Sequence, residues 1–183
     1  METKTQHQTK TWALDPMHSS VHFAVRHMVI SETKGDFKNY KLNVLANGLD
    51  FEGAKIELEI DVKSISTGMP DRDKHLLSPD FFDAEKFPSI KFVSDSFKKA
   101  NDEEYLLKGN ITVKGTSKPI ELKVNYGGQV IDPWGNLRAG FTIEGSINRF
   151  DFGLTWNSLM ETGSAVVGKI VKISSSIELV TQK

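Results

Sequence analysis

The sequence predicts an all-β protein of about eight to ten antiparallel strands in one domain, with one helical insertion. Apolar and polar residues alternate with period two along most of the chain, and turn-forming pairs such as Asn47-Gly48 separate the alternating segments. Alternation gives way to a helical pattern between Gly68 and Pro88. Period-two alternation is typical of strands with one buried and one solvated face. Strands of this number and spacing form a sandwich or a barrel, and the pattern leaves both open.

Length and composition limit the classes of function. The 183 residues suit one domain, and 23 basic against 24 acidic residues give no electrostatic basis for binding nucleic acid. The absence of cysteine excludes thiolate catalysis and disulfides. No run of residues could span a bilayer, so we expect no stable membrane insertion. The N-terminus is polar and lacks the apolar core of a signal peptide, which predicts a cytoplasmic protein, or a periplasmic one if a leader was removed.

The elements follow from the alternation and the turn signals. Residues 1–10 are expected to form a flexible N-terminal tail before a single domain over 11–183. Strands are expected within 11–28, 37–44, 55–62, 89–97, 105–113, 120–126, 137–143 and 170–180. Turns or breaks are expected at Gly35-Asp36, Asn47-Gly48, Ala100–Asp102, Gly109, Lys114–Thr116, Gly127-Gly128 and Asp132–Asn136. The irregular segment 147–168 is expected to cross one end of the structure.

The stretch between Gly68 and Pro88 is expected to cover the open end of the sheet. Pro70 suits a first helical turn, and the acidic residues that follow it suit the positive end of the helix dipole. Ser78-Pro79 reads as a second helix start, and Pro88 returns the chain to an extended path. The stretch is rich in Leu and Phe, which suits a helical cap.

The interior of such a barrel can be hollow or filled. An eight-stranded barrel is wide enough to hold one small apolar ligand if side chains do not fill it. The inward candidates mix small residues with large ones: Ala24 or Ala139 and Ser175 with Phe23, Phe92 and Phe141. That mixture permits a cavity, but a packed core would use the same residues, so alternation alone leaves both open.

Five motifs resemble the YceI-like family, in order over most of 11–180. They are WALDPMHSSVHFAVRH, SISTGMPDRDKHLLSPDFFDAEKFPSIKF, ITVKGTSKPIEL, INRFDFG and VVGKIVKISSSIEL. The resemblance implies a lipocalin-like antiparallel barrel with a helical cap, whose pore binds an isoprenoid lipid or quinone for carriage, storage or sequestration. It implies no cofactor and no catalysis, and the sheet edges and exposed Phe residues permit a homodimer. The residues expected to line the pore are Phe23, Val25, Phe37, Leu77, Phe81, Phe92, Phe141 and Trp156.

The polar residues near the cap are read as a structural network rather than as a catalytic or metal site. There is no GxSxG, cysteine or phosphate loop, and charges under a lid are normally paired. The expected network consists of His18, Arg72, Asp73, His75, Asp83, Arg149 and Asp151, with hydrogen bonds from the histidines anchoring the cap to the first strand. The alternative is a metal-assisted or hydrolytic enzyme using His18, His27 and His75. Because His18 and His27 have opposite parity on a strand, they cannot converge without a bulge, and we expect no metal site.

Overall fold

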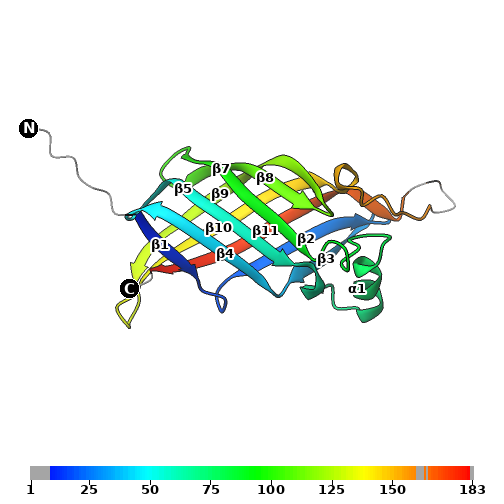
Figure 1. The fold of residues 1–183 in the computed structure, drawn as a ribbon, viewed down its shortest axis with the longest axis horizontal. Coiled ribbons are helices and arrows are strands. Elements are labelled where there is room, and N and C mark those ends of the chain that lie inside the picture. Colours follow the sequence, from blue (N-terminus) through cyan, green and yellow to red (C-terminus); the bar gives the residue numbers. More distant parts are fainter. Residues whose placement is uncertain (1–8, 160–162, 164, 182–183) are drawn as a thin grey trace, which may run out of the picture.

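The computed structural model describes residues 9–159, 163 and 165–181, which form a closed antiparallel barrel with one short α-helix (Figure 1). Most of the expected tail lies outside the described residues, and the first strand begins at Thr9. The strands are β1 (Thr9–Leu14), β2 (Ser20–His27), β3 (Ser31–Phe37), β4 (Tyr40–Asn47), β5 (Asp50–Asp61), β6 (Ile65–Ser66), β7 (Ser89–Lys99), β8 (Glu104–Val113), β9 (Thr116–Ile131), β10 (Leu137–Asn148) and β11 (Val167–Thr181). The helices are η1 (Val62–Ser64), α1 (Pro70–Leu77) and η2 (Arg149–Phe152).

The barrel closes because β11 pairs with β1. The ring of eight strands runs β1-β4-β5-β7-β8-β9-β10-β11, and every pair is antiparallel. Strand β11 is long enough to pair with β1 over Leu179–Thr181 and with β2 from Ser176 back to Val167. The pairs β2–β3 and β3–β6 extend the wall at the other end. The predicted all-β, lipocalin-like barrel is therefore confirmed, and the sandwich is excluded.

Helix α1 covers one end of the barrel, as Figure 1 shows. It begins with Pro70 and carries Asp71 and Asp73 in its first turn, as expected. The predicted second helix at Ser78-Pro79 is wrong. Instead, the chain forms successive turns in which the amides of Phe81 and Asp83 donate to the Ser78 carbonyl. No helix in the described part of the chain is both long and apolar enough to cross a bilayer.

Three expected turns or breaks at glycine are wrong. Gly35 lies within β3, because the Phe23 ring occupies the place of a side chain: an added Cβ would lie 2.4 Å from Phe23 Cζ. The turn lies instead between β2 and β3. Strand β8 runs unbroken through Gly109, where a Cβ would lie 2.6 Å from Phe92 Cζ. Strand β9 continues through Gly127-Gly128 but bulges there, because Gly127 has no partner between the pairs Tyr126–Phe141 and Gly128–Gly140.

The buried side chains form two clusters, one toward each end of the barrel. The cluster at the β1 end is rich in aromatic rings, and the rings of Trp12 and Phe141 both lie 4.9 Å from that of Phe51. Trp12 and Phe51 are fully buried. The second cluster lies at the α1 end and includes Phe81 and Phe152. The interior between the two clusters is where the candidate site lies.

Candidate ligand cavity

A continuous apolar cavity of about 240 Å³ lies inside the barrel. Its wall draws on both buried clusters, from Phe51 and Leu179 near β1 to Leu76 and Phe82 beneath α1. Except for His22, Arg149 and Ser175, every lining residue is Val, Leu, Ile or Phe. An apolar cavity of about 150 Å³ in another protein stays dry and binds benzene. This interior is larger, and it can enclose hydrocarbon without offering any buried carboxylate.

The structure places six of the eight predicted lining residues on the cavity wall. Leu77 and Trp156 lie outside the wall. Leu76 of α1 faces the interior, and Leu77, the next residue on the helix, is rotated away from it. The Trp156 ring instead packs against Phe81 at 5.2 Å. The six on the wall are Phe23, Val25, Phe37, Phe81, Phe92 and Phe141. Their contact with a ligand stays a prediction.

Many wall residues were missing from the predicted set, although their alternation could have shown them. Strand β11 is the clearest case: Ile173, Ser175, Ile177 and Leu179 all line the cavity. Alternation places Ile173, Ile177 and Leu179 on one face of the strand, the face that also carries the inward candidate Ser175. Which of the two faces turned inward depended on barrel closure, which the local pattern does not contain.

Arg149 is buried at the cavity wall and bonds to main-chain oxygens, so it does not join the predicted network of charged side chains near the cap. Its Nε donates to the Gly168 carbonyl at 2.8 Å, and its two terminal nitrogens donate to the carbonyls of Leu154, Trp156 and Val167. Asp151 is exposed. Burial lowers the pKa of Arg149. These bonds fasten the connection after η2 to the start of β11, so Arg149 positions one end of the cavity.

The start of α1 is held by a small polar group that includes Thr67, which sequence reasoning missed. Arg72 Nε donates to the Thr67 hydroxyl at 2.7 Å, and that hydroxyl donates to Asp73 Oδ1. The Thr67 amide also donates to Asp73 Oδ1, at 2.9 Å. Because Thr67 directly follows β6, this group ties the helix to the barrel wall.

The remaining predicted network residues lie in separate local pairs, so the single network is wrong. His75 Nε2 lies 3.0 Å from Asp80 Oδ2, and its ring packs edge-on against Trp156 at 4.7 Å. Asp83 pairs with Lys86 at 3.3 Å. Within the described residues, no hydrogen bond joins a histidine of β2 or of the connection before it to α1. Each cap residue finds a partner near it in sequence, which is why no shared network forms.

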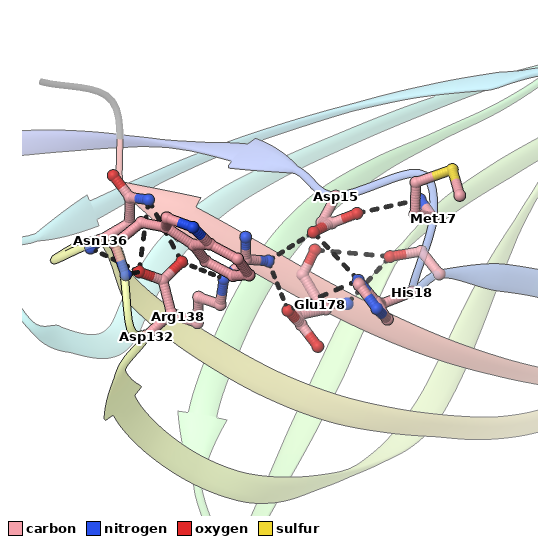
Figure 2. A network of polar contacts seen from close by, with 9 residues as sticks. Asp15, Met17, His18, Asp132, Asn136, Arg138 and Glu178 are labelled. Carbon is pink, nitrogen blue, oxygen red and sulfur yellow. Dashed lines mark hydrogen bonds and ion pairs between the residues drawn. The ribbon is translucent and has the colours of Figure 1, made fainter.

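His18 belongs to a different cluster, on the connection between β1 and β2 (Figure 2). Its Nδ1 lies 3.1 Å from Asp15 Oδ2. Arg138 of β10 bonds to Asp15, to Asp132 at 2.7 Å and to Glu178 at 2.6 Å. We call these five residues the Arg138 cluster. Sequence reasoning missed it, because its members come from three distant segments that meet only when the barrel closes.

The guanidinium of Arg138 sets the electrostatics of this cluster. Its hydrogen bond holds the pKa of Asp15 down at about 2, and the same group lowers the pKa of Asp132. Oxygens of Asp15 and Glu178 and a ring nitrogen of His18 all lie within 4.8 Å of one another, a spacing that a metal could use. The guanidinium, however, already bonds to both carboxylates. The cluster is an ion-pair group that joins β10 and β11 to the β1–β2 connection.

The three histidines of the alternative enzyme hypothesis lie on different elements. His18 is in the Arg138 cluster, His27 ends β2, and His75 lies on α1 with Asp80 as its partner. Among the described residues, the one group of donors that converges at metal-binding distance includes neither His27 nor His75. The arrangement therefore does not support a shared metal or catalytic site for them.

The fold and the interior define the class: a small closed β-barrel with a helical cap and an apolar cavity, as in lipocalin-like proteins. The model of the YceI-like domain matches residues 12–179, so the chain belongs to the YceI-like family. Protein YceI of Salmonella newport is 36% identical over 166 residues, which are 91% of this chain and 83% of that protein.

Two solved structures are similar in fold. The YceI protein of Campylobacter jejuni superposes with a TM-score of 0.73 at 30% identity, over 86% of this chain and 90% of that one. A polyisoprenoid binding domain from Saccharophagus degradans superposes with a TM-score of 0.66 at 15% identity, over 96% of this chain and 100% of that one. At that low identity, the second match shows a common fold alone.

Proposed function

We propose that this protein binds an elongated apolar molecule, an isoprenoid lipid or quinone, inside the barrel and carries or sequesters it without chemistry. The observation behind the proposal is the continuous apolar cavity, whose wall is almost entirely aliphatic and Phe side chains. The polyisoprenoid binding domain with the same fold supports an isoprenoid as the class of ligand. The cavity wall carries no carboxylate, and its one histidine, His22, is exposed to solvent, so no buried general acid–base pair faces the interior, which supports binding without catalysis.

Hydrocarbon burial is sufficient for such binding. Each buried CH₂ group contributes about 0.8 kcal/mol, so a five-carbon isoprene unit contributes about 4 kcal/mol. Association costs about 4–15 kcal/mol, so burial of about four units, worth about 16 kcal/mol, exceeds that whole range. Such binding depends on the shape and dryness of the interior, which suits a wall with few polar groups.

Native mass spectrometry of the purified protein, followed by organic extraction, tests this proposal. We expect an added mass that is released by extraction and identified as an isoprenoid lipid or quinone. Delipidated protein should also take up an added isoprenoid quinone. If the protein carries no lipid and delipidated protein takes up no quinone, the proposal is wrong.

A matched pair of variants on β11 locates the ligand. Ser175 lines the middle of the wall, while Ser174 beside it is exposed. The Ser175→Phe variant places a ring inside the cavity, and we expect it to lower quinone affinity at least about tenfold, because it displaces more than one isoprene unit. The Ser174→Phe variant adds the same ring on the outside and should bind as the parent does. Equal affinity of the two variants would place the ligand elsewhere.

A further inference from the structure

The turn between β2 and β3 exposes three consecutive apolar side chains. Met28, Val29 and Ile30 are 40%, 57% and 86% exposed, and Leu159, at 73%, lies on the neighbouring connection. The Met28 amide donates to the carbonyl of Val166, which holds that connection beside the turn. We call Met28, Val29, Ile30 and Leu159 the apolar tip. Single exposed apolar residues are common on protein surfaces, but a continuous group of this kind marks a contact surface.

Two of these apolar residues have backbone conformations that their side chains disfavour. Met28 and Val29 have φ angles of 52° and 66°, in the left-handed region that favours Gly, Asn or Asp. For a β-branched residue such as Val29 this conformation is strained. A turn selected only for connecting two strands would use the residues that suit its backbone. Strain retained with exposed apolar side chains points to a role for the side chains themselves.

Basic residues lie on the strands next to the apolar tip: Arg26 donates to the Val29 carbonyl at 2.6 Å, and Lys34 and Lys172 flank Ala24 farther along β2. Among the described residues of 26–34 and 165–172, the exposed cations are Arg26, Lys34, Lys169 and Lys172, and Glu32 is the single carboxylate. Glu32 is paired with Lys172 at 2.6 Å. The whole chain has a net charge of −1, so this positive surface is a local feature. Apolar side chains with cations beside them match an anionic bilayer, which offers phosphates above hydrocarbon.

The tip lies at the end of the barrel that α1 covers. Figure 1 shows the end of β2 and helix α1 at the same end, away from β1. Val25 of β2 lines the cavity, and so does Val167, which pairs with His27. The cavity therefore reaches β2, which leads into the turn, and the start of β11, which follows the connection that carries Leu159. A surface that contacts the tip would lie close to this end of the cavity.

We propose that the apolar tip docks on the surface of an anionic lipid bilayer, with Val29 and Ile30 among the lipid chains and the neighbouring cations at the phosphates. The docking goes beyond the proposed ligand binding and does not depend on it, because it uses outward-facing side chains. A second exposed apolar group consists of Val130 and Ile131 at the end of β9 and Trp134 on the β9–β10 turn. Its neighbours include the carboxylates of the Arg138 cluster, so it lacks the positive surroundings and supplies a control.

Vesicle flotation tests the docking. The parent protein should float with vesicles of phosphatidylcholine and phosphatidylglycerol, more weakly with phosphatidylcholine alone, and less as salt rises. The variant Met28→Asn, Val29→Gly, Ile30→Ser should bind at least about tenfold more weakly, because it removes the apolar contact. Its thermal stability should equal or exceed that of the parent, since Asn and Gly suit the left-handed backbone. Loss of binding with stability intact supports docking through the tip.

Two further variants distinguish electrostatic attraction to the bilayer from nonspecific adsorption of exposed apolar side chains. Lys34→Gln with Lys169→Gln should weaken binding to the anionic vesicles alone, while Trp134→Ser should bind as the parent does. Undiminished binding of the tip variant, or loss of binding in Trp134→Ser, would overturn the proposal. The parent protein could instead fail to float and form a dimer that the tip variant abolishes. That result would show that the tip is a contact between two copies of the chain, and it would overturn the docking. The Ser175→Phe variant should float normally, so failure of ligand binding and failure of docking are distinguishable.

Discussion

Replacing Asp15 by Asn tests how the Arg138 cluster stabilises the barrel. Arg138, with smaller contributions from His18 and the Met17 amide, lowers the pKa of Asp15 from 3.8 to about 2, which corresponds to about 2 kcal/mol of stability near neutral pH. The side chain is 12% exposed, and solvent screening reduces this value to about 1–2 kcal/mol. Because Asn preserves the shape and Arg138 keeps Asp132 and Glu178, the substitution removes one charge without leaving the cation unpaired.

The sign of the pH dependence follows from the lowered pKa. The folded protein holds Asp15 ionised more strongly than the unfolded chain does, so the contribution is fully present above about pH 4–5. It is lost as pH falls toward 2. The difference in unfolding free energy between the parent and Asp15→Asn should therefore be about 1–2 kcal/mol at pH 7 and should shrink toward zero in acid.

Urea unfolding followed by tryptophan fluorescence at a series of pH values measures this difference. Asp102→Asn is the matched control, because Asp102 is 99% exposed and pairs with Lys99 at the surface. Its effect should be close to zero at every pH. A difference for Asp15→Asn that is constant between pH 7 and pH 3, or no larger than that of the control, would refute the reasoning.

Two further predictions concern the cavity wall and the cap. Gly35→Ala drives a methyl group into the Phe23 ring and should cost about 1–3 kcal/mol in denaturant unfolding. Gly140→Ala, with open space at its Cβ, should cost less, and equal costs would contradict the close contact at Gly35. Arg72→Ala and Asp73→Asn loosen α1 and should lower the melting temperature more than quinone affinity, since neither side chain lines the cavity. A larger effect on affinity would place them in the binding site.

The sequence predicted the fold well, because each strand carries its own period-two pattern. Ile56, Leu58 and Ile60 of β5 share one face by alternation alone, and all three line the cavity. The errors occurred where a distant partner overrides a local signal. Gly35 reads as a turn residue, but the Phe23 ring of the neighbouring strand requires a position without a side chain.

The polar groups were harder to predict than the cavity wall. The partners of Arg138 come from the β1–β2 connection, the β9–β10 turn and β11, and no local pattern links them. Arg149 donates to carbonyl oxygens of Gly168 and Trp156, and the irregular connection that places Trp156 beside it has no local sequence signal. Whether the interior is hollow also depended on how the two faces of the barrel fit together, which alternation does not encode.

The aromatic cluster at the β1 end forms part of the cavity wall. Phe51 packs against both Trp12 and Phe141 there, and Phe51 and Phe141 line the cavity, so the proposed ligand would meet aromatic rings at that end. The proposed binding mode therefore limits chain length: a short prenyl chain should lie wholly inside the cavity, and the far units of a longer chain should remain outside. Affinity should therefore rise with each added unit and then level off, and the number of units at that plateau would report the depth of the barrel.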